Sequence, residues 1–124
     1  MRQVALREFC ACRAGDKGDI SDVTIFASRP EFFAVLQAEL TTERVLQFMA
    51  PIGPERIERF EVANLEAVKF VLYGALGGGG AASLRADNLG KNMGVTLLRL
   101  QVPVPDLLLP LISYPRPPDF PFRE

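Results

Sequence analysis

The residues that could carry out chemistry are concentrated in two segments, and the first of them is Arg13–Asp19. This segment holds two glycines and four charged residues in seven positions. Because the chain has no histidine, general acid–base work would fall to Asp, Glu, Lys or Tyr. The candidate catalytic residues are therefore Asp16, Lys17 and Asp19, and Arg13 is a candidate ligand for an anion.

The same segment suits an anion better than a metal ion. Asp16, Asp19 and Asp22 recur every three residues and could hold Mg²⁺ or Ca²⁺. The EF-hand pattern fails, however, because neither its sixth-position Gly nor its twelfth-position Glu is present. Arg13 and Lys17 place positive charge inside the cluster, which favours internal ion pairs or an anionic ligand. We expect no metal here, and a bound anion and a rigid structural loop stay open as the two interpretations.

The second segment is glycine-rich and could cradle a phosphate or carboxylate through its backbone. It follows a predicted helix instead of linking a strand to one, so the dinucleotide fingerprint is not met, and Walker A fails as well. What remains is a run of unshielded backbone N–H groups with polar and basic neighbours. The alternative is that the glycines permit close packing of the backbone. The candidate ligand-binding residues are Gly77, Gly78, Gly79, Gly80, Ser83, Arg85 and Lys91.

The remaining reactive residue types are expected to be structural. Cys10 and Cys12 lie on one face if their segment is extended, but their spacing rarely suits a disulfide. A zinc site would need ligands from a second subunit, so we expect reduced thiols that pack as small hydrophobes. Tyr73 and Tyr114 are expected to pack with hydrogen-bonded hydroxyl groups.

Length and composition predict one soluble domain. The chain has 124 residues, of which 48% are hydrophobic and 23% charged, and its formal net charge is −1. A nucleic-acid partner is not indicated, because no basic face is present. The longest stretch without a charged residue, Phe70–Leu84, is shorter than the roughly 20 residues of a membrane span. No secretory signal follows position 2, so we expect a cytoplasmic protein.

Hydrophobic periodicity predicts an α+β fold in which two strands flank the charged loop. Phe33, Leu36 and Leu40 should point inward from the first helix, and Thr41 or Thr42 should cap the second. The expected strands are Gln3–Phe9, Asp22–Ala27 and Arg56–Val62. The expected helices are Ser28–Leu40, Glu43–Met49 and Asn64–Leu76, and the last of them is apolar nearly all round. A hairpin should join Ala82–Ala86 to a strand at Val95–Val102.

The chain divides into a body, residues 1–102, and a proline-rich tail, residues 103–124. Seven of the ten prolines lie in this tail, around the apolar stretch Leu107–Ile112. So much leucine is poorly suited to float in water. We expect the tail to pack on the body or on a neighbouring subunit.

Three segments, Arg13–Asp19, Asn64–Phe70 and Gly74–Lys91, occur in the order seen in the AtuA-like family. Over about Val4 to Val102 the chain resembles the small C-terminal domain of acyclic terpene utilisation proteins, here as a stand-alone chain. The resemblance implies a ferredoxin-like α+β fold, with an antiparallel or mixed sheet and about three helices on one face. It also implies a role beside a larger AtuA-like subunit and an association with acyclic terpenoid and acyl-CoA breakdown, but no established reaction.

These observations give one main hypothesis and two alternatives. In the main hypothesis the chain is an AtuA-like small subunit or accessory domain within a homo- or hetero-oligomer. The two segments then meet at one edge of the sheet, where Arg13, Lys17, Arg85 or Lys91 neutralises an anionic ligand such as an acyl-CoA. The first alternative is a non-catalytic assembly module that uses the apolar helix and the tail. The second is a small lyase or hydratase that uses an Asp–Lys pair.

Overall fold

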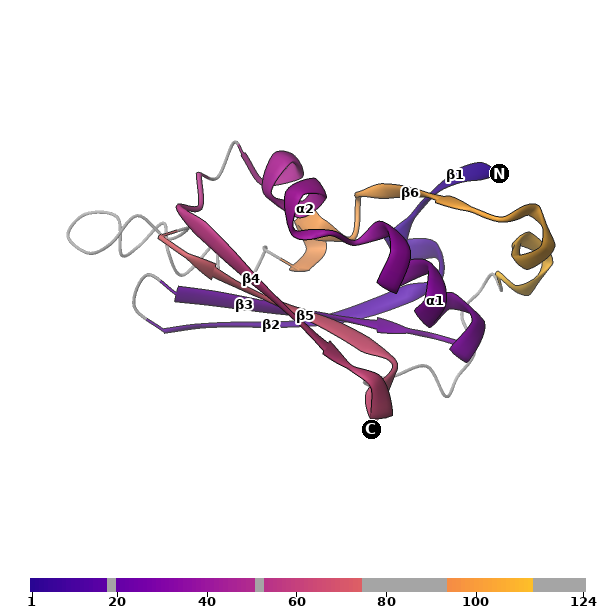
Figure 1. Ribbon diagram of the computed structural model, residues 1–124, viewed down its shortest axis with the longest axis horizontal. Coiled ribbons are helices and arrows are strands. Elements are labelled where there is room, and N and C mark those ends of the chain that lie inside the picture. The colour runs from indigo at the N-terminus through magenta and orange to yellow at the C-terminus, as the bar shows by residue number, and fades with distance from the viewer. Residues whose placement is uncertain (18–19, 51–52, 75–93, 113–124) are drawn as a thin grey trace.

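The computed structural model describes residues 1–17, 20–50, 53–74 and 94–112. The chain forms a four-stranded sheet with two helices on one of its faces, and a two-stranded ribbon extends the helix layer (Figure 1). We call the face under the helices the inner face and the opposite one the outer face. The strands are β1 (Arg2–Ala5), β2 (Cys10–Lys17), β3 (Ile20–Ala27), β4 (Arg56–Val62), β5 (Ala67–Tyr73) and β6 (Gln101–Val104).

The helices are α1 (Pro30–Glu39) and α2 (Thr42–Phe48), and the 3₁₀ turns are η1 (Leu6–Glu8), η2 (Ala63–Leu65) and η3 (Asp106–Leu111). The sheet has the order β2-β3-β5-β4, and every neighbouring pair is antiparallel. Since β3 and β4 are both antiparallel to β5, they run parallel to each other, and the two helices connect them. The result is a split β-α-β unit with β5 inserted in its middle. The predicted α+β class is confirmed.

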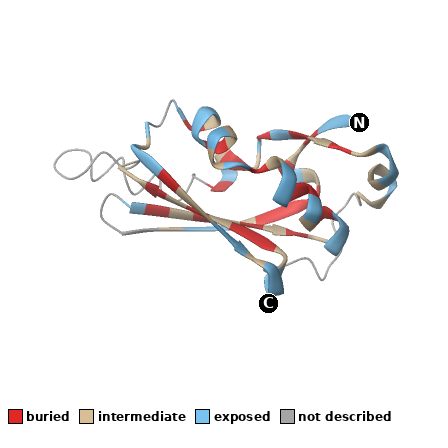
Figure 2. Cartoon of the chain, viewed as in Figure 1, coloured by how far each residue is buried: buried red, intermediate tan, exposed pale blue. Residues whose placement is uncertain are grey.

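The hydrophobic core fills the space between the inner face and the helix layer. Phe9 and Phe32 stack at a centroid distance of 4.9 Å, with both side chains buried. On the sheet, Val23, Ile25 and Phe70 are fully buried and supply the other side of the core. Figure 2 shows buried segments where the sheet and the helices face each other. Cys10 is buried and Cys12 partly buried, both as reduced thiols, as the sequence predicted.

Helix α1 forms where the sequence predicted it, and Leu36 and Leu40 are buried as predicted, but Phe32 takes the inward position expected for Phe33. Phe32, Val35 and Leu36 are buried, whereas Phe33 is only half-buried. The predicted capping box at Ser28 and Glu31 does not form, because Arg29 is the N-cap and its side chain makes no capping hydrogen bond. The helix therefore begins at Pro30, whose fixed φ suits the first helical position.

The helix layer is fixed to the sheet by hydrogen bonds at the end of α1. Arg59 on β4 donates from Nε to the Leu40 carbonyl at 2.6 Å and from Nη2 to the Gln37 carbonyl at 3.2 Å. These carbonyls lack helical partners, and a guanidinium satisfies them well. Hydrogen bonds from Gln37 and then Arg59 lower the pKa of the Glu61 carboxyl. Thr41 caps α2 as predicted, its Oγ1 accepting from the Arg44 amide at 3.1 Å.

The predicted helix over Asn64–Leu76 is wrong. Residues 63–65 form η2, Glu66 turns the chain in the left-handed region with φ 53°, and β5 follows from residue 67. Along β5, fully buried Val68, Phe70 and Leu72 alternate with half-buried residues. A central strand is partly buried on both faces, so its apolar residues also satisfy helical spacing by coincidence.

Both ends of the described chain also differ from the sequence prediction. The expected strand Gln3–Phe9 breaks into β1 and η1, where the Leu6 and Arg7 amides donate to the Leu100 and Leu98 carbonyls. In place of a strand from residue 95, residues 94–97 form a helical turn and β6 begins only at Gln101. The partner of β6 is β1. The Ala82–Ala86 arm of the predicted hairpin lies outside the described residues.

The first part of the predicted tail packs against the body. Val104 is buried in β6, and four apolar residues of residues 108–112 are partly buried against the core, namely Leu108, Leu109, Leu111 and Ile112. Residues 113–124 lie outside the described part, and the domain boundary at residue 102 stays a prediction. Among the described residues, no helix has the length and apolar character needed to cross a membrane.

The two neighbouring phenylalanines of α1 give a direct test of this packing. We expect Phe32→Ala to lower the free energy of unfolding by about 3–5 kcal/mol, because it leaves a cavity beside Phe9. Phe33→Ala, the matched control on the same helix, should cost about half as much or less because that side chain is already half-exposed. Urea unfolding measures both, and a larger loss in Phe33→Ala would contradict the orientation of α1.

Candidate functional site

The candidate site lies at the end of the sheet where β2 and β3 are joined. Backbone pairing places Lys17 opposite Ile20, Ile20 opposite Tyr73, and Tyr73 opposite Arg56. One row of residues therefore crosses all four strands at this end. The β2–β3 hairpin therefore ends beside Tyr73, the last residue of β5, and the glycine-rich segment begins directly after Tyr73.

Gly74 directs the chain away from β5 at this point. Its φ is +79°, a conformation that favours glycine. A Cβ added here would lie 2.8 Å from Cγ of Glu55, and the Glu55 amide donates to the Tyr73 carbonyl at 2.7 Å. Any side chain at this position would be strained and would clash with Glu55, so the glycine-rich segment starts from a fixed position at the end of the sheet.

The chain returns from that segment against β2. A Cβ added to Gly94 would lie 2.6 Å from Sγ of Cys12 and 3.6 Å from Cβ of Ala14. Gly94 is therefore in close contact with the strand that carries the charged segment. The residue before residues 75–93 thus follows the end of β5 that pairs with Ile20, and the residue after them lies against the middle of β2.

The structure describes only some of the predicted site residues. The predicted loop at Arg13–Asp19 is wrong over its first five residues, because residues 13–17 continue β2 and pair with β3. Arg13 is exposed and opposite Thr24, and Asp16 is opposite Ser21. Outside the described residues lie Asp19, Gly77, Gly78, Gly79, Gly80, Ser83, Arg85 and Lys91. Convergence of the two segments thus stays a prediction.

Polar groups near this end of the sheet are satisfied. Ser21 is fully buried, and its hydroxyl donates to the Gly15 carbonyl at 3.2 Å. Within the described ranges, no buried side-chain nitrogen or oxygen lacks a hydrogen-bond partner. The same part of the chain contains no group of three or more Cys, Asp or Glu residues that could hold a metal ion.

The outer face carries a polar cluster at this end. Tyr73 has the hydrogen-bonded hydroxyl group that the sequence predicted, but its partners Arg56 and Glu58 were not predicted. The Tyr73 hydroxyl donates to Oε1 of Glu58 at 2.8 Å, and the Arg56 guanidinium lies 4.0 Å from the centre of the Tyr73 ring. The Glu58 carboxylate, by accepting this bond, raises the pKa of the Tyr73 hydroxyl, and partial burial adds to the effect. The cluster thus holds a protonated phenol between a carboxylate and a guanidinium.

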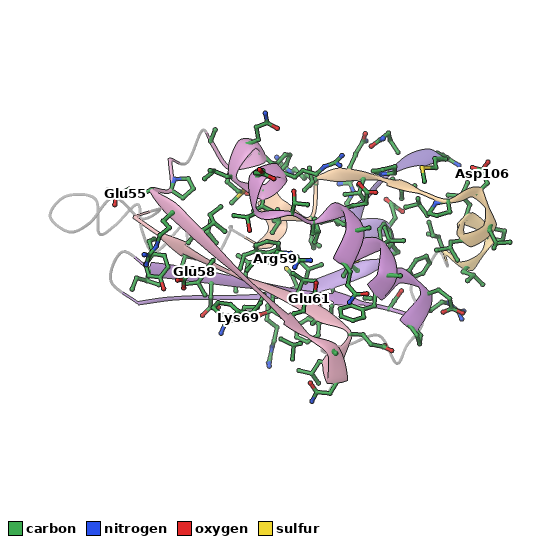
Figure 3. All side chains as sticks on the ribbon, viewed as in Figure 1. Glu55, Glu58, Arg59, Glu61, Lys69 and Asp106 are labelled. Atoms are coloured by element: carbon green, nitrogen blue, oxygen red, sulfur yellow. The ribbon has the colours of Figure 1, made fainter. Side chains whose placement is uncertain are left out.

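Only strand geometry could have identified this cluster from the sequence. Arg56 and Glu58 are two residues apart, so they share a face of β4. Tyr73 joins them because it is paired with Arg56, a long-range register that no local pattern contains. Lys69 extends from the same outer face, away from the helices (Figure 3), and is paired with Thr24 and Phe60.

Comparison with known proteins identifies the family. The family model described as AtuA ferredoxin-like domain matches residues 4–103. The chain belongs to the AtuA ferredoxin-like domain family. The AtuA ferredoxin-like domain accounts for most of the 124 residues, and the α+β architecture with antiparallel sheets is consistent with it. Searches of curated proteins and of solved structures gave no significant match.

The Tyr73–Glu58 bond predicts a measurable shift in tyrosine titration. In a Tyr114→Phe background, Glu58→Gln should lower the pKa of Tyr73 toward about 10, its ordinary value, because the anionic acceptor is removed. Absorbance of tyrosinate against pH measures the change. The folded state holds the Tyr73 proton more tightly than the unfolded state. The hydrogen bond therefore contributes fully to the free energy of unfolding below a pH of about 10, and this contribution declines as the pH rises from there toward the folded-state pKa.

Glu55→Gln is the matched control for that titration, because Glu55 is exposed and next to the same strand end. It should leave the Tyr73 titration nearly unchanged. Identical titration curves for Glu58→Gln and the parent would contradict the bond.

Proposed function

We propose that this chain is the small subunit or accessory domain of an AtuA-like assembly, and that it binds an anionic ligand of the acyl-CoA type together with a larger AtuA-like subunit. The observation that carries the proposal is the family match, which spans residues 4–103 of the 124-residue chain. Membership of this family supports an association with a larger AtuA-like protein. We place this assembly in the cytoplasm.

The described ends of the two segments support an anion site at the β2–β3 hairpin. Gly74 follows the end of β5 that pairs with Ile20 of the hairpin, and Gly94 lies against Cys12 and Ala14 of β2. Arg13 is exposed on β2, and Arg56 is exposed at the end of β4. Guanidinium groups and backbone N–H groups together recognise phosphate and carboxylate well. On this basis Arg13, Lys17, Arg85 and Lys91 are the proposed ligands for the anion, and Asp16 and Asp19 the proposed bases.

An assembly module without chemistry of its own is the second candidate function. The apolar helix expected to drive assembly is instead the buried strand β5, so that surface does not exist. The outer face supports the idea in its place. Ile20 is 40% and Phe60 49% exposed there, on the two strands that flank β5. Exposed apolar residues beside a Tyr–Arg pair are typical of interface centres.

The lyase or hydratase hypothesis stays a prediction. Asp16 and Lys17 are neighbours in β2, but they occupy different rows of the sheet, opposite Ser21 and Ile20 respectively. A catalytic pair of these two residues therefore has no support from the strand register.

Titration calorimetry with an acyl-CoA thioester tests the proposal, using the full chain alone and mixed with a larger AtuA-like protein. We expect a stable complex with that protein and saturable ligand binding in at least one setting. Arg13→Ala should weaken ligand binding about tenfold, the effect of losing one charge-assisted hydrogen bond. Arg29→Ala, an exposed arginine before α1, is the control and should change the affinity less than about twofold.

Absence of binding in both settings would retire the anionic-ligand part of the proposal. A complex that forms without any ligand binding would favour the assembly module. A chain that never associates with the larger protein would contradict the subunit role itself.

A further inference from the structure

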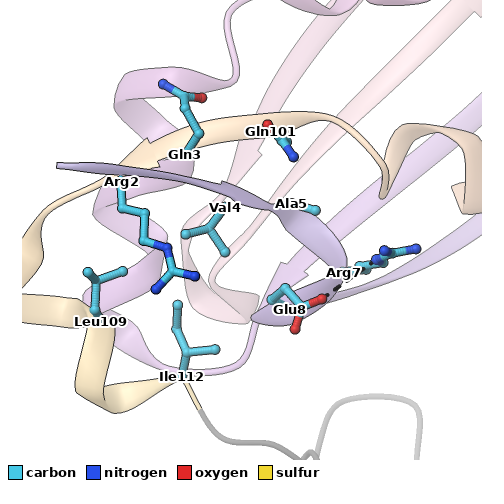
Figure 4. A pocket seen from close by; sticks show the side chains of 9 residues that line it. All are labelled: Arg2, Gln3, Val4, Ala5, Arg7, Glu8, Gln101, Leu109 and Ile112. Atoms are coloured by element: carbon cyan, nitrogen blue, oxygen red, sulfur yellow. Dashed lines mark ion pairs between the residues drawn. The ribbon is translucent and has the colours of Figure 1, made fainter.

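A pocket lies at the end of the molecule opposite the β2–β3 hairpin. It has a volume of about 500 Å³ and is formed by the β1–β6 ribbon, η1 and the end of η3 (Figure 4). Ligand pockets in proteins commonly have volumes of roughly 300–1,000 Å³. The lining residues that matter for its chemistry are Arg2, Val4, Arg7, Glu8, Leu109 and Ile112.

The charged residues of this pocket leave one positive charge in excess. Arg7 and Glu8 form an ion pair, with 3.6 Å between Nε and Oε2. The N-terminal ammonium is paired with Asp106 at 3.1 Å, outside the pocket lining. Arg2 has no ion pair within 4.0 Å among residues 1–17, 20–50, 53–74 and 94–112. Its guanidinium is thus the cation that a ligand could neutralise.

One part of the pocket, which we call the apolar floor, is lined by Val4, Leu109 and Ile112, whereas most of the lining surface is polar. A charged group and hydrophobic surface are therefore presented together. Figure 4 shows the Arg2 guanidinium extending between β1 and the side chains of Leu109 and Ile112. Val4 is buried, and Leu109 and Ile112 are half-buried with their other sides against the core. A guanidinium pairs with carboxylate or phosphate through two parallel hydrogen bonds, while an aliphatic group is stabilised by burial against such a floor.

We propose that this pocket binds a small amphiphilic anion, an aliphatic carboxylate or phosphate monoester, with the headgroup on Arg2 and the chain against Leu109 and Ile112. The site is separate from the one proposed at the β2–β3 hairpin, and it uses none of the same residues. It therefore gives the domain a binding function of its own, whether or not the larger subunit is present.

The test uses the full chain, with octanoate and octyl phosphate as probes and titration calorimetry as the readout. We expect saturable binding of at least one probe, with the tighter of the two identifying the preferred headgroup. Acetate should bind at least about tenfold more weakly than octanoate, because it cannot use the apolar floor. Octanamide should also bind more weakly, because it lacks the charge that pairs with Arg2.

Matched variants then assign the binding to this pocket. Arg2→Gln should weaken binding of the preferred probe about tenfold or more, while Arg29→Gln should change it less than about twofold. Both arginines are exposed, so unchanged urea unfolding midpoints are expected and show that each variant folds.

Absence of saturable binding by either probe would overturn the proposal. So would equal losses in Arg2→Gln and Arg29→Gln, since binding would then follow net charge. Acetate binding as tightly as octanoate would overturn the role of the apolar floor.

Discussion

The pairing of β3 with β5 sets the register of the whole four-stranded sheet. These two strands form the centre of the sheet. On their outer sides, β3 pairs with the edge strand β2 and β5 pairs with the edge strand β4. The register with Ile20 opposite Tyr73 sets which residues reach the core, because a slip of one residue would exchange the two faces of a strand. Val23 and Ile25 would then point away from the helices. The same register brings the end of β5 beside the β2–β3 hairpin, so packing of the core and placement of the candidate site have a single cause.

The two faces of the sheet have separate roles as a consequence. The inner face binds the helix layer through the apolar core and through Arg59, whose guanidinium joins β4 to the carbonyl groups at the end of α1. The outer face holds the Arg56–Tyr73–Glu58 cluster among exposed apolar residues. Function is therefore expected at the outer face, at the hairpin end and at the ribbon pocket, while the inner face supplies stability. This separation allows substitutions at the proposed sites to be tested without unfolding the domain.

The sequence was informative where local signals and tertiary packing agree. Pro30 and Thr41 mark the starts of α1 and α2 correctly, because proline geometry and capping are local effects. It failed at β5, where burial on both faces conceals the strand period, and at residues 94–97, where Leu97 and Leu100 have the spacing of a helical turn that was taken for a strand. The β1–β6 ribbon and the Arg56–Tyr73 contact join distant parts of the chain, so no local pattern could predict them. Of the predicted site, Arg13, Asp16 and Lys17 are placed on β2 by their strand pairing.

The charged hairpin and the glycine-rich segment are proposed to meet at one rim. The most direct measurement is a distance between spin labels at Asp19→Cys and Ser83→Cys, in a background in which Cys10 and Cys12 are replaced by alanine. Ser83 is nine residues from Gly74, and a fully extended chain of that length spans about 30 Å. If the two segments meet, one main distance population lies below about 20 Å. A population centred near or above about 30 Å would show that the segment extends away from the hairpin and that the two segments do not meet.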